Sequence, residues 1–141
     1  MAIATELLEP DDLLVIVWDG VVSGSDWEAH TRQRLADDPT WPSGTRRLAD
    51  ITSFDPSALT SPDVATVVEL LRTRISRLVA TRIAVVASSG WAIARDFERQ
   101  IDRLGSTTIV FNEVKSAADW LGIDLDVART ATRRLRAEAR R

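Results

Sequence analysis

Two adjacent serines and a glycine form the turn whose residue types are best suited to chemistry. Ser88, Ser89 and Gly90 directly follow the apolar run Ile83–Ala87 and precede a helical pattern. At such a strand-to-helix turn, backbone N–H groups, hydroxyls and the positive end of the helix dipole can bind phosphate. The sequence contains neither Gly-x-x-x-x-Gly-Lys-Ser/Thr nor Gly-x-Gly-x-x-Gly, and helix caps use the same residue types. We therefore interpret Ser88–Gly90, called the serine turn below, as a helix cap.

A second set of hydroxyls lies in the segment 50–62, which has the composition of a loop. Ser61 followed by Pro62 is a typical start of a helix, because proline tolerates the first turn. A phosphate on Ser57, Thr60 or Ser61 would lie near that N-terminus, where negative charge is stabilised. We therefore predict phosphorylation in this segment, with Ser57 as the candidate acceptor.

The residues required by common enzymes and metal sites are scarce. His30 is the single histidine, there is no cysteine, and no Gly-x-Ser-x-Gly motif occurs. A hydrolase needs a nucleophile, a base and an orienting acid, and zinc or iron sites use several histidines or thiolates. The carboxylate pairs Asp11-Asp12 and Asp37-Asp38 fit turns and helix ends. We expect no catalytic residue, no metal and no cofactor.

Five tryptophans are many for a chain of 141 residues with three phenylalanines and no tyrosine. Most should be buried, whereas Trp41 in a proline-flanked loop and Trp91 beside the serine turn are candidate contacts for a partner protein. An apolar cleft lined by tryptophans is the alternative, and it would bind a small apolar molecule. The predicted partner or ligand surface comprises Trp41, Asp50, Ser57, Ser88, Ser89 and Trp91.

Length, charge and hydropathy limit the class of protein. A chain of 141 residues can form one domain with its own core. The formal net charge of −3 argues against general nucleic-acid binding, although arginines crowd the C-terminus. There is no basic, apolar leader at the N-terminus and no apolar run of about 18 residues, the length that a membrane span needs. We expect a cytoplasmic protein without a membrane span or a nucleic-acid partner.

Hydrophobic periodicity predicts the strands that position these residues. Ile3–Leu8 and Leu13–Val17 flank a proline-containing turn and predict an opening β-hairpin. Asp19-Gly20 ends the second run, or Val21-Val22 continue it past a bulge. Thr45–Ile51, Arg82–Ala87 and Thr107–Phe111 predict three further strands. The run at 82–87 is apolar without alternation, which is typical of a strand covered on both faces. Helices should therefore lie on both sides of the sheet.

Two helices are predicted between the early strands. Ser25 and Glu28 fit a capping box for a helix from residue 26 to about 36. Ser61 fits the N-cap of the next helix, whose apolar stripe extends to Leu78. Both segments connect strands that should be parallel.

Three more helices complete the pattern. The serine turn precedes a helix that ends at Gly105, and Asn112 precedes a short helix that ends at Gly122. Asp124 or Asp126 caps the last helix. Strands that alternate with helices of this length predict an α/β fold with a largely parallel or mixed sheet and right-handed crossovers.

Several segments in this order resemble the bacterial STAS-like domains of the SpoIIAA-like superfamily. The resemblance covers residues 13–122, and it implies a single-layer, mixed and mostly parallel sheet with helices packed on it. We therefore expect a STAS-like α/β domain over residues 1–122 and an Arg-rich helix or tail over residues 123–141. The segments that carry the resemblance are Asp38–Pro42, Leu48–Ile51, Ile83–Val86, Ala92–Arg95, Phe97–Glu98, Val110–Phe111 and Ala117–Leu121.

The resemblance also implies functions. In the anti-sigma-factor antagonists of that superfamily, a partner kinase phosphorylates a serine or threonine in an Asp-Ser-Ser-Gly motif after a central strand. By position, the counterpart here is the segment 50–61, where Asp55-Pro56-Ser57 lacks the adjacent serine and glycine. The serine turn has similar letters but follows a later strand.

The hypothesis that follows is a non-catalytic regulatory domain that contacts a protein partner or forms a homo-oligomer such as a homodimer. A more distant kinship with the lipid-carrying CRAL-TRIO domains implies the alternative, a carrier or sensor of an apolar small molecule.

Overall fold

The computed structural model describes residues 2–8, 12–37, 46–73 and 81–141. Within these residues, the strands form one sheet in the order β1-β2-β3-β4-β5, antiparallel between β1 and β2 and parallel elsewhere. This confirms the predicted α/β fold class with a single mixed, mostly parallel sheet and an opening hairpin. The strands are β1 (Ile3–Leu8), β2 (Leu13–Val21), β3 (Arg46–Asp55), β4 (Arg82–Val86) and β5 (Thr107–Phe111).

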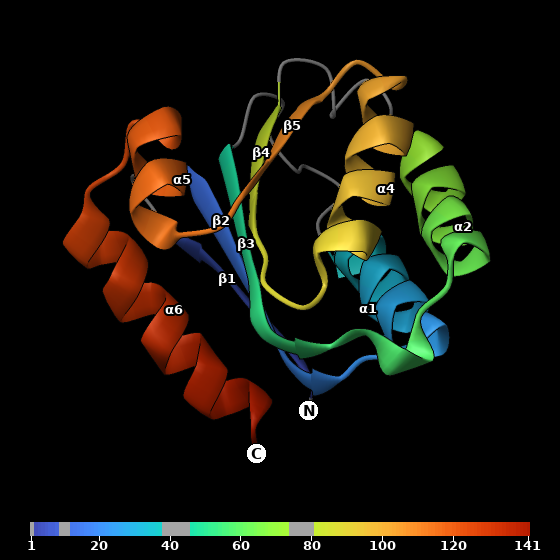
Figure 1. Cartoon of the computed structure of the whole chain (residues 1–141), viewed down its shortest axis with the longest axis horizontal. Coiled ribbons are helices and arrows are strands. Elements are labelled where there is room, and N and C mark those ends of the chain that lie inside the picture. The colour runs from blue at the N-terminus through green and yellow to red at the C-terminus, as the bar shows by residue number, and fades with distance from the viewer. Residues whose placement is uncertain (1, 9–11, 38–45, 74–80) are drawn as a thin grey trace.

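Helices cover both faces of the sheet (Figure 1). Because the strand order follows the chain order and parallel crossovers are right-handed, the three connecting helices α1, α2 and α4 lie on one face. The other face is covered by α5 and α6, which follow the last strand. The helices are α1 (Gly24–Asp37), α2 (Ser61–Arg72), α4 (Trp91–Asp102), α5 (Val114–Leu121) and α6 (Leu125–Ala139), with a short 3₁₀ helix at Pro56–Ala58.

Two strands extend beyond their apolar runs. A register shift between Val17 and Asp19 lets β2 continue to Val21, which is the predicted alternative of a strand that continues past a bulge. The extension pairs with the polar end of β3, so β3 reaches Asp55 through residues that we predicted as loop. Phe54 within this extension is buried. Tertiary pairing therefore overrides the loop-like composition of residues 52–55.

The first helix begins earlier than predicted. Ser23 donates its N–H to Asp26 Oδ2 at 3.1 Å, and the Asp26 N–H donates to Ser23 Oγ at 3.0 Å. This reciprocal capping box replaces the predicted box of Ser25 and Glu28, because Glu28 instead pairs with Arg32 at 2.9 Å one turn later. Two overlapping Ser-x-x-acid patterns occur here, and only one can start the helix.

Other helix starts also differ by one residue from the prediction. The N-cap of α2 is Thr60 instead of Ser61, and the Asp63 carboxylate accepts the Thr60 N–H at 2.9 Å. The N-cap of α5 is Glu113 instead of Asn112. The remainder of the predicted second stripe, residues 74–80, lies outside the described residues.

The helices α5 and α6 approach the sheet closely because small residues face it. Ala117, Ala118, Ala128 and Ala131 are buried against the strands. A methyl side chain lets a helix backbone lie near the sheet while the core stays densely packed. Residues 125–139 therefore form a helix that crosses β2 and β1. No helix in the described ranges has the length and hydrophobicity to cross a membrane.

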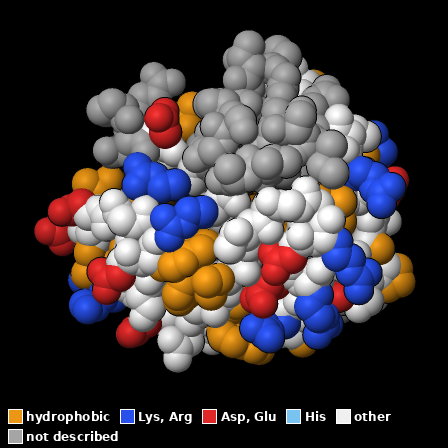
Figure 2. All heavy atoms as spheres, turned by 90° about the horizontal axis from the view of Figure 1, so that it is seen from above, with side chains coloured by type: hydrophobic (Ala, Val, Ile, Leu, Met, Phe, Trp, Pro, Cys, Tyr) orange, Lys and Arg blue, Asp and Glu red, His pale blue; other side chains and the backbone are white. Residues whose placement is uncertain are grey.

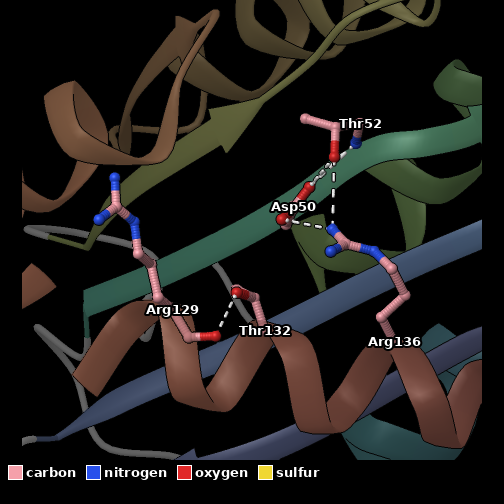
Figure 3. A network of polar contacts seen from close by, with 5 residues as sticks. All are labelled: Asp50, Thr52, Arg129, Thr132 and Arg136. Atoms are coloured by element: carbon pink, nitrogen blue, oxygen red, sulfur yellow. Dashed lines mark hydrogen bonds and ion pairs between the residues drawn. The ribbon is translucent and has the colours of Figure 1, made fainter. Parts of the chain in front are cut away.

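A buried ion pair fixes α6 on the sheet. Asp50 in β3 is 3% exposed, and Arg136 of α6 donates to its Oδ2 at 2.7 Å (Figure 3). Thr52 donates to Asp50 Oδ1 from its N–H at 3.0 Å and from its hydroxyl at 2.7 Å. Both carboxylate oxygens are therefore satisfied: Oδ1 by Thr52 of the same strand, and Oδ2 by Arg136, whose hydrogen bond depends on the docking of α6 on β3.

Removal of the Arg136 guanidinium tests this anchor. Arg136→Ala leaves the Asp50 carboxylate buried without its cation, and we expect a loss of about 3 kcal/mol in the free energy of unfolding. The control Arg133→Ala removes an exposed arginine from the same helix and should change stability by less than about 0.5 kcal/mol. Urea denaturation measures both. Equal stability of the two variants would contradict the anchoring role of the ion pair.

Candidate functional site

The face of the sheet beneath α1, α2 and α4 contains a cavity of about 120 Å³. Ile16 and Ala49 line it from the central strands β2 and β3, yet both side chains remain partly exposed. Residues at such positions in a sheet covered by helices are usually sealed, because protein interiors have few voids larger than a water molecule. The cavity is therefore a specific feature of this face.

The two faces of the sheet differ in how closely the helices approach. α2 packs against α1 and α4, while α5 and α6 pack directly on the strands. Toward the sheet, α1 and α2 present Trp27, Val67 and Leu71, which hold their backbones further away than alanine would. An apolar cavity of about 150 Å³ can hold benzene, so the space suits a small apolar molecule.

One end of the cavity is aromatic. Trp18 of β2 and Trp27 of α1 line it with ring centroids 5.0 Å apart in an edge-to-face arrangement. Phe97 of α4 lies 5.7 Å from the Trp27 ring. Such contacts stabilise the rings beyond their buried area and provide a rigid apolar wall.

Basic groups line the same cavity. His30 and Arg34 lie one turn apart on α1, and Arg47 enters from β3 with 6% exposure. Burial, followed by the charge of Arg34, lowers the pKa of Arg47 to about 9 and lowers the pKa of His30 below its ordinary value. At neutral pH Arg47 is therefore charged and His30 is uncharged. None of the cavity-lining residues in the described part of the chain is acidic.

The serines predicted as a ligand or partner surface lie elsewhere, where β3 and β4 end. Ser57, Ser88 and Ser89 are exposed, and so is Trp91 at the start of α4, with an exposed fraction of 41%. Ser89 donates its hydroxyl to the Phe54 carbonyl at 3.0 Å, which joins the serine turn to β3. We call Ser57, Ser88, Ser89 and Trp91 the carboxyl-edge surface.

Two predicted members of that surface are not part of it. Asp50 is buried against α6 on the opposite face of the sheet, so it cannot contribute to an exposed surface with the serines. Trp41 lies outside the described residues. The structure thus brings together the two turns that follow β3 and β4 and separates Asp50 from them.

The serine turn is shaped by packing. The serine hydroxyls do not cap α4, because Gly90 is the N-cap residue and has no side chain. Its φ of −87° is ordinary, but a Cβ atom at Gly90 would lie 2.6 Å from the Phe54 ring. Glycine is therefore required at this position by the close approach of the Phe54 ring.

Ser57 lies beside a carboxylate. It donates its N–H to Asp55 Oδ1 at 2.9 Å, and hydrogen bonds from its backbone and its hydroxyl lower the pKa of Asp55. A phosphate on Ser57 would place further negative charge next to this group. Within the described residues, no group of three acidic or histidine side chains is arranged to hold a metal ion.

Charges of both signs are mixed on the face shown in Figure 2, around a compact hydrophobic cluster next to the residues drawn in grey. Nucleic-acid interfaces typically gather basic residues in a patch or stripe. On this face, basic side chains are interspersed with acidic ones.

The sequence prediction of a tryptophan-lined cleft did not identify its position. That prediction named no tryptophan for the cleft, and the structure places Trp18 and Trp27 at the cavity. The usable signal was alternation, which places Trp18 on the same face of β2 as Leu14 and Ile16.

Comparison with known proteins supports the fold. The structure is similar to that of an uncharacterized protein from the DUF3478 family with a SpoIIAA-like fold, from Shewanella loihica PV-4. The TM-score is 0.57 at 20% sequence identity, and the similarity covers 85% of this chain and 94% of that chain. No protein-family model and no curated protein matches the chain. The similarity confirms the predicted SpoIIAA-like fold.

Replacement of His30 tests the electrostatics of the cavity. Because its pKa is lowered in the folded state, the unfolded chain binds more protons below about pH 6.5, so stability falls as the pH falls through that range. His30→Gln removes this contribution, and we expect a smaller loss of unfolding free energy between about pH 7 and pH 5. The measurement is urea denaturation at both values.

Arg34 and Arg47 are the charged groups that line the cavity with His30 in the described residues. The control Arg32→Gln changes an exposed residue of the same helix and should keep the pH dependence of the parent. Identical pH dependence in His30→Gln and the parent would refute the lowered pKa of His30.

Proposed function

We propose that this protein binds a small apolar molecule in the cavity between the sheet and α1, α2 and α4, and acts as its carrier or sensor. The observation that carries the proposal is the partial exposure of Ile16 and Ala49 in the middle of a covered sheet. Ligand sites are typically concave and mostly apolar, with a few polar groups that orient the ligand. The cavity has this composition.

The energetics of the core also support a ligand. Side chains around an empty space lose dispersion contacts, so an apolar cavity without an occupant lowers stability. A molecule that binds only the folded protein restores these contacts and raises stability by mass action. An apolar ligand and the folded chain would therefore stabilise each other, as expected of a carrier or a ligand sensor.

Toluene is a suitable probe of the cavity because it is apolar, uncharged and close to benzene in size. We expect saturating toluene to stabilise the protein by about 1 kcal/mol, which raises the midpoint of thermal unfolding by about 3 °C. Ala49→Leu fills the cavity from β3 and should abolish the shift. Differential scanning calorimetry measures it.

The matched control is Ala92→Leu, which adds the same atoms to an exposed position of α4. This variant should show the same toluene-induced rise in the midpoint of thermal unfolding as the parent protein. Toluene stabilisation that survives in Ala49→Leu, or is missing from the parent, would contradict binding in this cavity. Native mass spectrometry of detergent-free protein provides a second readout, because a bound apolar molecule adds its mass.

A second candidate function is non-catalytic contact with a protein partner, or homodimerisation, through the carboxyl-edge surface. Its support is the exposed indole of Trp91 beside two exposed serines, since tryptophan is enriched among the residues that dominate binding energy. Ser57 is the proposed phosphoacceptor on this surface. A phosphate there would be repelled by Asp55 and would change the turn that presents it.

Trp91→Ala tests this second function. Loss of a dominant interface tryptophan costs about 2 kcal/mol or more, so we expect about 30-fold weaker self-association or partner binding, measured by analytical ultracentrifugation or affinity capture. Ser57→Asp should weaken the same contact. Val127→Ala removes an exposed apolar residue from α6 and serves as the control. Unchanged binding in Trp91→Ala would rule out this indole as the contact.

A further inference from the structure

We propose that the ligand of this cavity is a small apolar acid, with its anionic group against Arg34 and Arg47 and its apolar body against Trp18 and Trp27. This inference rests on the proposed function and names the chemical class of the ligand.

The basic and the aromatic residues that line the cavity lie at different positions along the strands. Arg47 of β3 pairs in register with Leu14 of β2, and both residues line the cavity. Trp18 lies four residues beyond Leu14 on the same face of β2, which corresponds to about 13 Å of strand. The basic group of β3 therefore lies toward one end of the cavity, and the aromatic wall lies toward the other.

The basic end is built by two elements. Arg34 on α1 is close enough to Arg47 on β3 that its charge contributes to the lowered pKa of Arg47, and it acts on His30 in the same way. His30 and Arg34 share one face of α1 because they are four residues apart. Two guanidinium groups and a neutral imidazole thus lie together beside apolar side chains.

The burial of Arg47 is the unusual feature. An arginine that only covers apolar surface with its stem normally extends its head group into water. Arg47 is 6% exposed in all, so its guanidinium lies within the protein, at a cost in desolvation. Beside the partners that the arginines have within the protein, a negative ligand group at this end would stabilise the buried charge further, and a positive one would destabilise it.

Guanidinium geometry favours a carboxylate or a similar anion. Each guanidinium carries five N–H donors in a plane and can bind a carboxylate through two parallel hydrogen bonds. An arginine can therefore serve a ligand and a protein partner at once. The volume of about 120 Å³ favours an acid with one ring or a short chain, smaller than a membrane lipid.

Three probes of matched shape distinguish the ligand charge: benzoate, benzyl alcohol and benzylamine. We expect benzoate to bind at least about tenfold more tightly than benzyl alcohol, and benzylamine to bind most weakly, because only the carboxylate forms charge-assisted hydrogen bonds. Titrations of ¹⁵N-labelled protein, followed at the tryptophan indole N–H signals, give the dissociation constants. Toluene serves as the uncharged reference.

Arginine variants assign the effect to the cavity. Arg34→Gln should lower benzoate affinity by about tenfold and leave toluene affinity unchanged. Arg47→Leu should do the same, and Arg34→Gln carries the test if Arg47→Leu does not fold, because Arg34 is only half-buried. Arg32→Gln, an exposed arginine on the same helix, should change neither affinity.

The outcomes separate this inference from the proposed function. If toluene binds but benzoate is no tighter than benzyl alcohol, the acidic ligand is refuted and the apolar cavity stands. If no probe binds, both fail. If Arg32→Gln weakens benzoate as much as Arg34→Gln, the anion binds through surface charge and the inference is refuted. A benzoate preference that is lost only in the cavity variants supports it.

Discussion

Three right-handed crossovers determine the layout of this molecule. Because the strands follow one another across the sheet in chain order, each crossover places its helix on the same face, so α1, α2 and α4 form one layer. The opposite face is then left to the C-terminal helices. Without α5 and α6, the apolar residues on that face, Leu48 among them, would be exposed to water. The C-terminal residues 114–139 thus complete the core.

The two layers meet the sheet in different ways. On the C-terminal side, alanines bring α5 and α6 close to the strands, and the Asp50–Arg136 pair fixes α6 on β3. On the other side, α1 and α2 carry larger side chains, and α2 packs mainly against α1 and α4. The cavity arises on this looser side.

The candidate sites could be predicted only in part. The exposed turns at Ser57 and Ser88–Ser89 follow from turn chemistry and from the carboxyl ends of parallel strands. Asp50 is the opposite case, because its partner Arg136 lies 86 residues away along the chain. A carboxylate before a loop-like segment looks exposed in sequence, and only the docking of α6 buries it. Trp18 and Trp27 likewise meet only after β2 and α1 are packed together.

The amino-acid sequence by itself determined the order of the elements, the mixed sheet with its opening hairpin, and the end of α5 at Gly122, which has positive φ. These depend on local periodicity and on turn chemistry, which act over a few residues. The helix α4 ends at Asp102, three residues before the glycine predicted to stop it. The tertiary structure alone decided the extension of β3 to Asp55, the burial of Asp50 and the existence of the cavity. The alternation of side chains along a strand assigns each residue to one face of the sheet. The space between the sheet and its helices depends on the volumes of side chains that come from elements far apart in the chain.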